Sequence, residues 1–122
     1  MPERGERETR LRRLRRTESI RRLVAETALS TSNFIAPIFV RYGEGVTEPV
    51  AAMPGVNRYS VDRVGGYVRR LAEARIPAVL LFGIPESKDE SGSGAYAGNG
   101  VVPRAIAEVK KAAPEMLVAA DV

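Results

Sequence analysis

Ile76-Pro77-Ala78-Val79-Leu80-Leu81-Phe82 is an unbroken apolar stretch, and it is the part of the chain that decides the fold. A strand with one face in water alternates apolar and polar residues, whereas a strand of a parallel sheet that is covered on both faces is apolar throughout. The stretch is far shorter than the roughly 20 residues that a membrane-spanning helix needs. It therefore predicts a strand buried on both faces of a parallel sheet.

Two further apolar stretches, 34–40 and 116–122, give the same prediction of buried strands. Between the three stretches, the helical spacing of apolar residues predicts one helix over 61–75, with Ser60 as its N-terminal cap. A second helix is predicted where Pro103 suits a first turn. The apolar face of that second helix is predicted to comprise Val102, Ile106 and Val109.

The order strand, helix, strand, helix, strand indicates an α/β fold, because parallel strands need crossover connections that return the chain to the same end of the sheet. A closed (β/α)8 barrel takes about 200–250 residues, whereas this chain has 122. Because three strands cannot close a barrel, we expect the front part of a larger enzyme. On its own, such a sheet is expected to be unstable or to associate through its open edges.

Residues 1–16 are polar and lack helical periodicity, which predicts an extended or mobile N-terminal arm. The incomplete domain is expected to occupy residues 17–122. It is expected to begin with a short helix over 18–28 that Thr17 caps.

The positive charge of the chain is concentrated in the arm. Residues 1–22 hold nine arginines and four glutamates, whereas residues 23–122 hold ten basic and eleven acidic residues. The near-neutral body gives no electrostatic basis for binding nucleic acid. The arm is open to two interpretations, contact with a neighbouring subunit or binding of an acidic partner or nucleic acid, although no aromatic side chain is interleaved for stacking on bases.

The chain contains neither cysteine nor histidine. Disulfides, zinc sites with nitrogen and sulfur ligands, and catalysis by imidazole or thiolate are therefore excluded for these residues. The lack of cysteine suits a cytoplasmic protein, and no apolar run is long enough to predict a membrane partner.

Asp121 is the candidate site residue, because it ends an apolar strand at the edge where parallel α/β folds build their sites. It is either a site carboxylate or a structural acid that caps the next loop. The glycine- and serine-rich loop 83–100 is either an active-site loop or a solvated connector, and it lacks the sequence of a phosphate-binding loop. The lysines, Lys88, Lys110 and Lys111, are expected to be solvated, whereas a Schiff-base lysine needs a desolvated setting.

Several strings of residues carry a resemblance to a known family. They include Met53-Pro54-Gly55-Val56-Asn57-Arg58-Tyr59-Ser60, then Lys88-Asp89 followed by Gly92-Ser93-Gly94-Ala95-Tyr96, and finally Ala120-Asp121-Val122. In this order and spacing, they resemble the porphobilinogen synthases, also called 5-aminolevulinate dehydratases, over nearly the whole chain.

The resemblance implies that residues 17–122 form the first three strands and intervening helices of a (β/α)8 TIM barrel. It implies a lyase of tetrapyrrole and heme biosynthesis, which condenses two molecules of 5-aminolevulinate into porphobilinogen with loss of water. It further implies an arm that wraps a neighbouring subunit, usually in a homo-octamer.

In that family two lysines on later strands form Schiff bases with substrate, and Lys88 matches neither by its context. The zinc or magnesium loop of the family follows directly after Val122, so no cofactor or metal ligand is expected within this chain. Of the family's chemical groups only Asp121 remains, in a supporting role. We therefore expect residues 1–122 alone to be inactive, and the alternative is a non-catalytic interaction module whose basic arm binds an acidic partner or nucleic acid.

Overall fold

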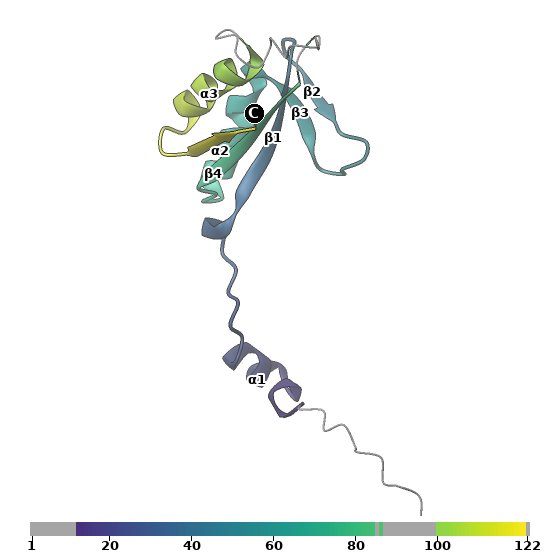
Figure 1. The fold of residues 1–122 in the computed structure, drawn as a ribbon, viewed down its shortest axis with the longest axis vertical. Helices are drawn as coiled ribbons and strands as arrows, with labels where there is room; N and C mark the ends of the chain where they lie inside the picture. Colours follow the sequence, from purple (N-terminus) through teal and green to yellow (C-terminus); the bar gives the residue numbers. More distant parts are fainter. Residues whose placement is uncertain (1–11, 85, 87–99, 122) are drawn as a thin grey trace, which may run out of the picture.

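The computed structural model of the chain describes residues 12–84, 86 and 100–121 (Figure 1). Those residues form one five-stranded sheet in the order β2-β3-β1-β4-β5, in which only β2 runs antiparallel to its neighbour. The strands are β1 (Ile35–Arg41), β2 (Thr47–Pro49), β3 (Asn57–Ser60), β4 (Ala78–Ile84) and β5 (Leu117–Ala120). The α-helices are α1 (Glu18–Leu23), α2 (Val61–Glu73) and α3 (Val101–Ala112), and short 3-10 turns lie at Arg13–Arg15 and Thr31–Asn33.

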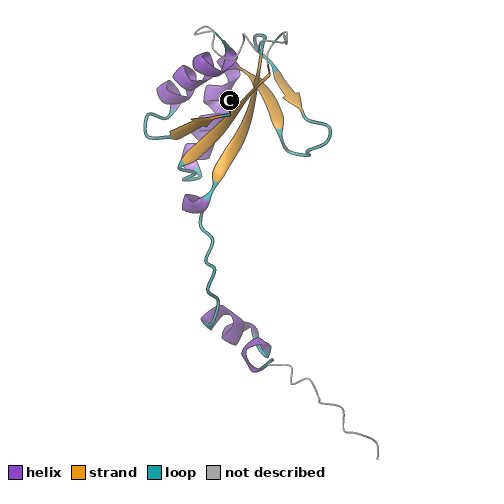
Figure 2. Cartoon of the chain, viewed as in Figure 1, coloured by secondary structure: helices purple, strands orange, loops and turns teal. Residues whose placement is uncertain are grey.

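Helices α2 and α3 pack against the same face of the sheet, and the hydrophobic core lies between these two layers (Figure 2). The sheet contributes Ile38 and Val40 from β1 and Val79 and Leu81 from β4, which are all fully buried. The helices contribute the fully buried Val64, Val68, Ala105 and Val109. The predicted α/β order of strands and crossover helices is therefore confirmed for β1, β4 and β5.

The prediction that the strands are buried on both faces is wrong for the described residues. Side chains alternate between the two faces of a strand, and α2 and α3 cover only one of them. Ile35, on the opposite face, is 63% exposed, and Leu117 of β5 is 67% exposed. Of the described residues of the predicted strand, 116–121, Met116 alone is buried, and it lies directly before β5. The predicted burial of 116–122 therefore does not hold for β5.

No strand was predicted between the stretch 34–40 and the helix over 61–75, but β2 and β3 lie there, so the described sheet has five strands and not three. Strand β2 pairs with β3 in antiparallel register, and β3 pairs in parallel with the end of β1. Neither strand was predicted, because the residues around them are typical of turns. Pro49 is tolerated because β2 is an edge strand, and Gly55 takes a left-handed conformation in the hairpin connection.

The helices follow the predicted pattern with shifted ends. Helix α2 ends at Glu73, and Arg75 follows with a left-handed φ of 62°. Helix α1 ends at Leu23 and not at Ala28, and its Thr17 cap accepts a hydrogen bond from the Ile20 amide at 3.2 Å.

The buried stripe of α3 comprises Val101, Ala105 and Val109. Val102 and Ile106, which the sequence assigned to the apolar face, lie at the margin of that stripe and are half-buried.

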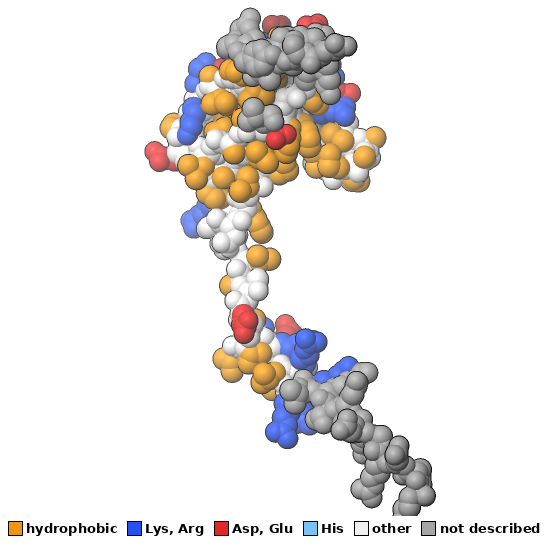
Figure 3. Space-filling model, viewed as in Figure 1, with side chains coloured by type: hydrophobic (Ala, Val, Ile, Leu, Met, Phe, Trp, Pro, Cys, Tyr) orange, Lys and Arg blue, Asp and Glu red, His pale blue; other side chains and the backbone are white. Residues whose placement is uncertain are grey.

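In the N-terminal segment 12–30, which includes the described end of the predicted arm (1–16) and helix α1, the helix contacts the neighbouring 3-10 turn and stands away from the sheet (Figure 1). Leu14, Leu23 and Leu29 are 60%, 85% and 75% exposed. The space-filling view shows arginine side chains gathered around α1 and hydrophobic side chains spread over the uncovered face of the sheet (Figure 3). The N-terminal segment 12–30 therefore carries both basic and apolar side chains, and none of its residues is buried.

Gly83 lets α3 approach the end of β4. A Cβ atom at this position would overlap the side chain of Val102, the second residue of α3. Gly66 of α2 is different, because a Cβ there would meet nothing within 4 Å. Gly83 is therefore required by packing, whereas Gly66 only lowers the helix propensity of α2.

Replacing Gly83 with alanine should lower the free energy of unfolding by about 1–3 kcal/mol, because the added methyl group overpacks the contact with Val102. The matched variant Gly66→Ala should raise it by about 0.5–1 kcal/mol, because alanine favours an exposed helical position over glycine. Urea unfolding followed by circular dichroism at equal protein concentration measures both. Equal effects of the two substitutions would contradict the proposed contact.

Candidate functional site

The candidate site lies at the C-terminal edge of the parallel strands, on the face that α2 and α3 leave uncovered. Phe39 of β1 and Phe82 of β4 are paired in register there, and their rings stack with centroids 5.3 Å apart. Arg58 of β3 occupies the matching position beside Phe39. An aromatic pair therefore forms the middle of a row of side chains near this edge.

Asp121 extends this row on the side of β5. The last registered pair of β4 and β5 joins Leu81 to Ala120, and the Asp121 amide donates to the Leu81 carbonyl at 3.0 Å. Asp121 thus lies one position further, level with Phe82. Its side chain is exposed, so the carboxylate is accessible to solvent. The residue lies at the edge of the sheet that was predicted for it.

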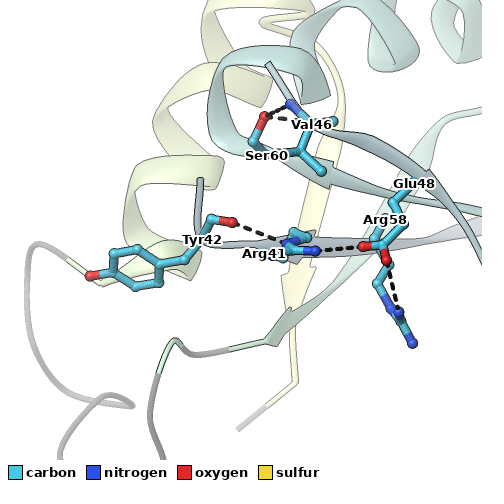
Figure 4. A network of polar contacts seen from close by, with 6 residues as sticks. All are labelled: Arg41, Tyr42, Val46, Glu48, Arg58 and Ser60. Carbon is cyan, nitrogen blue, oxygen red and sulfur yellow. Dashed lines mark hydrogen bonds and ion pairs between the residues drawn. The ribbon is translucent and has the colours of Figure 1, made fainter. Parts of the chain in front are cut away.

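Sequence reasoning missed a polar network at the opposite end of the row (Figure 4). Glu48 of β2 pairs with Arg41 of β1 at 2.5 Å, and Arg58 lies 4.0 Å from the same carboxylate. The Arg41 Nε atom also donates to the Tyr42 carbonyl at 3.1 Å. Since each charged side chain is about 40% exposed, these ion pairs contribute little stability, on the order of 0–1 kcal/mol each. They orient the β2–β3 hairpin beside the end of β1.

The sequence contains one indication of this network, which is that charged residues lie directly beside apolar strand residues. Arg41 follows the apolar stretch 34–40, and Arg58 lies within the string that carries the family resemblance. Glu48 sits in a stretch with no apolar alternation, so its pairing depends on the hairpin and could not be foreseen.

A second polar cluster anchors the loop between β1 and β2 to the start of α2. The buried Ser60 hydroxyl accepts a hydrogen bond from the Val46 amide at 2.9 Å and lies 3.3 Å from the Val46 carbonyl. The Asp62 carboxylate accepts from the Gly45 amide at 2.9 Å. Ser60 occupies the N-cap position as predicted, but its side chain bonds this loop and leaves the helical amides uncapped.

Hydrogen bonding lowers the pKa of Asp62 below its ordinary value of 3.8. The largest cause is a hydrogen bond from the Ser60 side chain, followed by the one from the Gly45 amide. The same Ser60 hydroxyl lies 3.3 Å from the Val46 carbonyl, so the carboxylate and this carbonyl compete for its single proton.

The lysines of α3 are exposed, as predicted, and both are engaged at the surface. The Lys110 ammonium donates to the carbonyls of Met116 at 2.6 Å and Pro114 at 3.4 Å, which closes the turn from α3 into β5. Lys111 pairs with Glu108 at 2.7 Å. Neither has the desolvated setting of a Schiff-base lysine. Lys88 and most of the loop 83–100 lie outside the described residues.

The side chains of the described residues do not fit a metal centre. No group of three or more acidic side chains gathers in the described part of the chain, and the sequence has no cysteine or histidine. Asp121 is a single carboxylate, which can accept a proton or face a cation but cannot hold a metal ion alone. Within the same described residues, none of the helices combines the length and hydropathy required to cross a bilayer.

Comparisons with known proteins identify one family. The family model described as delta-aminolevulinic acid dehydratase matches residues 8–122. The delta-aminolevulinic acid dehydratase of Synechococcus elongatus is 45% identical over 110 residues, and that of Halalkalibacterium halodurans is 46% identical over 110 residues. Each match covers 90% of this chain and 34% of the relative. The chain therefore spans about a third of the length of these relatives.

A solved structure gives the same result for the fold. The crystal structure of delta-aminolevulinic acid dehydratase (porphobilinogen synthase) from Toxoplasma gondii, in complex with the reaction product porphobilinogen, superposes with a TM-score of 0.73 at 33% identity. The match covers 94% of this chain and 33% of that one. The α/β fold is consistent with part of a TIM barrel, and the comparisons do not support the alternative of a non-catalytic module.

The stability of the chain should fall more steeply in acid than that of an Asp62→Asn variant. Because the folded pKa of Asp62 lies below 3.8, its contribution is present above the unfolded value and is lost as the pH falls through the folded value. Urea midpoints between about pH 6 and about pH 2.5 measure this difference. Glu73→Gln, at the other end of α2, is the control, and a parallel decline for the Asp62→Asn variant would refute the anchoring role of Asp62.

Proposed function

The chain belongs to the delta-aminolevulinic acid dehydratase family, and from this membership we propose that residues 1–122 form the first part of a porphobilinogen synthase. The proposed enzyme is a lyase that condenses two molecules of 5-aminolevulinate into porphobilinogen with loss of water, in the cytoplasm. The observation that carries the proposal is the match of residues 8–122 to the family. The position of Asp121 at the C-terminal edge of the parallel strands supports it.

In this proposal the chain supplies a frame and one wall of the active site. Strands β1, β4 and β5 become the first three strands of the barrel, and their uncovered face turns toward the barrel interior. The stacked rings of Phe39 and Phe82 then form an apolar floor beside Asp121. The Asp121 carboxylate plays a supporting role by facing cationic groups of the substrate or accepting a proton from them.

The groups that bond covalently to substrate come from other parts of the proposed enzyme. A Schiff base requires a lysine amine that is deprotonated in a desolvated setting, whereas Lys110 and Lys111 are exposed. The zinc or magnesium ion of the complete enzyme likewise needs ligands, and the described part of this chain brings no group of three or more acidic side chains together. The contribution of residues 1–122 is therefore structural and electrostatic.

The arm (1–16), together with the rest of the N-terminal segment up to residue 30, is proposed to contact a neighbouring subunit in a homo-octamer of the complete enzyme. Leu23 and Leu29 are among the most exposed large apolar residues of the described chain, and burying each would stabilise a contact by roughly 1.5–3 kcal/mol. The arginines around α1 would remain at the rim of that contact. No nucleic acid or membrane partner belongs to the proposal.

The proposed activity is testable with a fusion protein. Residues 1–122 replace the matching segment of the Synechococcus elongatus relative, and porphobilinogen formed from 5-aminolevulinate is quantified by liquid chromatography and mass spectrometry. The fusion protein should form porphobilinogen, and purified residues 1–122 should form none above a blank. A folded but inactive fusion protein would refute the proposed contribution of the chain. Activity of residues 1–122 alone would refute the proposal that the groups bonding covalently to substrate come from other parts of the enzyme.

Asp121→Asn in the fusion protein should lower kcat by roughly 100-fold or more, which is the usual contribution of a positioned acid–base group. The matched control is Glu115→Gln, because Glu115 is also an exposed acid beside β5 but lies at its opposite end. Circular dichroism and the urea midpoint verify that both variants fold. An unchanged kcat in the Asp121→Asn variant would assign this carboxylate to the structural role of capping a loop.

A double substitution of Leu23 and Leu29 by aspartate should reduce the oligomer size of the fusion protein, because it places charge in the proposed apolar contact. Both side chains are exposed, and helix α1, which ends at Leu23, stands away from the sheet (Figure 1), so the fold of the subunit should survive. Size-exclusion chromatography with light scattering measures the mass. Glu26→Gln, on the same N-terminal segment, should leave the mass unchanged, and an unchanged mass of the double variant would eliminate the segment around α1 as a subunit contact.

A further inference from the structure

We draw no further inference here: the strongest candidate, the open apolar groove between the C-terminal ends of α2 and α3 and the N-terminal ends of β4 and β5, carries nothing, because nothing in the structure shows what covers it in a chain that spans a third of its relatives' length.

Discussion

The packing of two helices on one face of the sheet is the constraint on which the rest of this structure depends. Fully buried valines of α2 and α3 meet fully buried aliphatic residues of β1 and β4. Each such side chain contributes roughly 1.5–3 kcal/mol on burial, so this layer supplies most of the apolar stabilisation in the described residues. The close approach of Val102 to Gly83 shows how tightly the first turn of α3 is held at the end of β4.

The same packing leaves the other face of the sheet uncovered, and the candidate site lies on that face. Strand register places Phe39, Phe82 and the position of Asp121 in one row near the C-terminal edge. In parallel α/β folds this is the edge where side chains from separate strands converge on a substrate. Under the proposed function, this row forms one wall of the active site, and Asp121 is the carboxylate at its β5 end. That arrangement agrees with membership in a family whose members are about three times as long.

Much of this arrangement could be predicted from the sequence, because helical periodicity and apolar strands are local signals. Helix α2 was predicted over 61–75 from the helical spacing of its apolar residues, and Val64 and Val68 lie on its buried face. The parallel order followed from the alternation of elements. The β2–β3 hairpin was missed because Pro49 and Gly55 are typical of a loop, and its pairing with β1 is a non-local contact. Burial on both faces was predicted from composition, yet Ile35 and Leu117 are exposed, because an apolar strand cannot indicate whether its second covering layer belongs to the same stretch of chain. The position of Asp121 at the end of an apolar strand could be predicted from the sequence, and its role in a site stays a prediction. The Arg41–Glu48 pair could be found only from the fold.

The central claim is that these residues form a one-sided layer, which further parts of the family fold complete. Amide hydrogen exchange tests this claim most directly. It would be measured on dilute, monomeric residues 1–122 and on the same residues within the Synechococcus elongatus fusion protein. Strands β1 and β4 have neighbours on both sides, so their amides should exchange slowly in both proteins. The amides of β5, an edge strand in the described sheet, should exchange fast in the isolated chain and slowly in the fusion protein. Equal exchange of β5 in the two proteins would contradict the account.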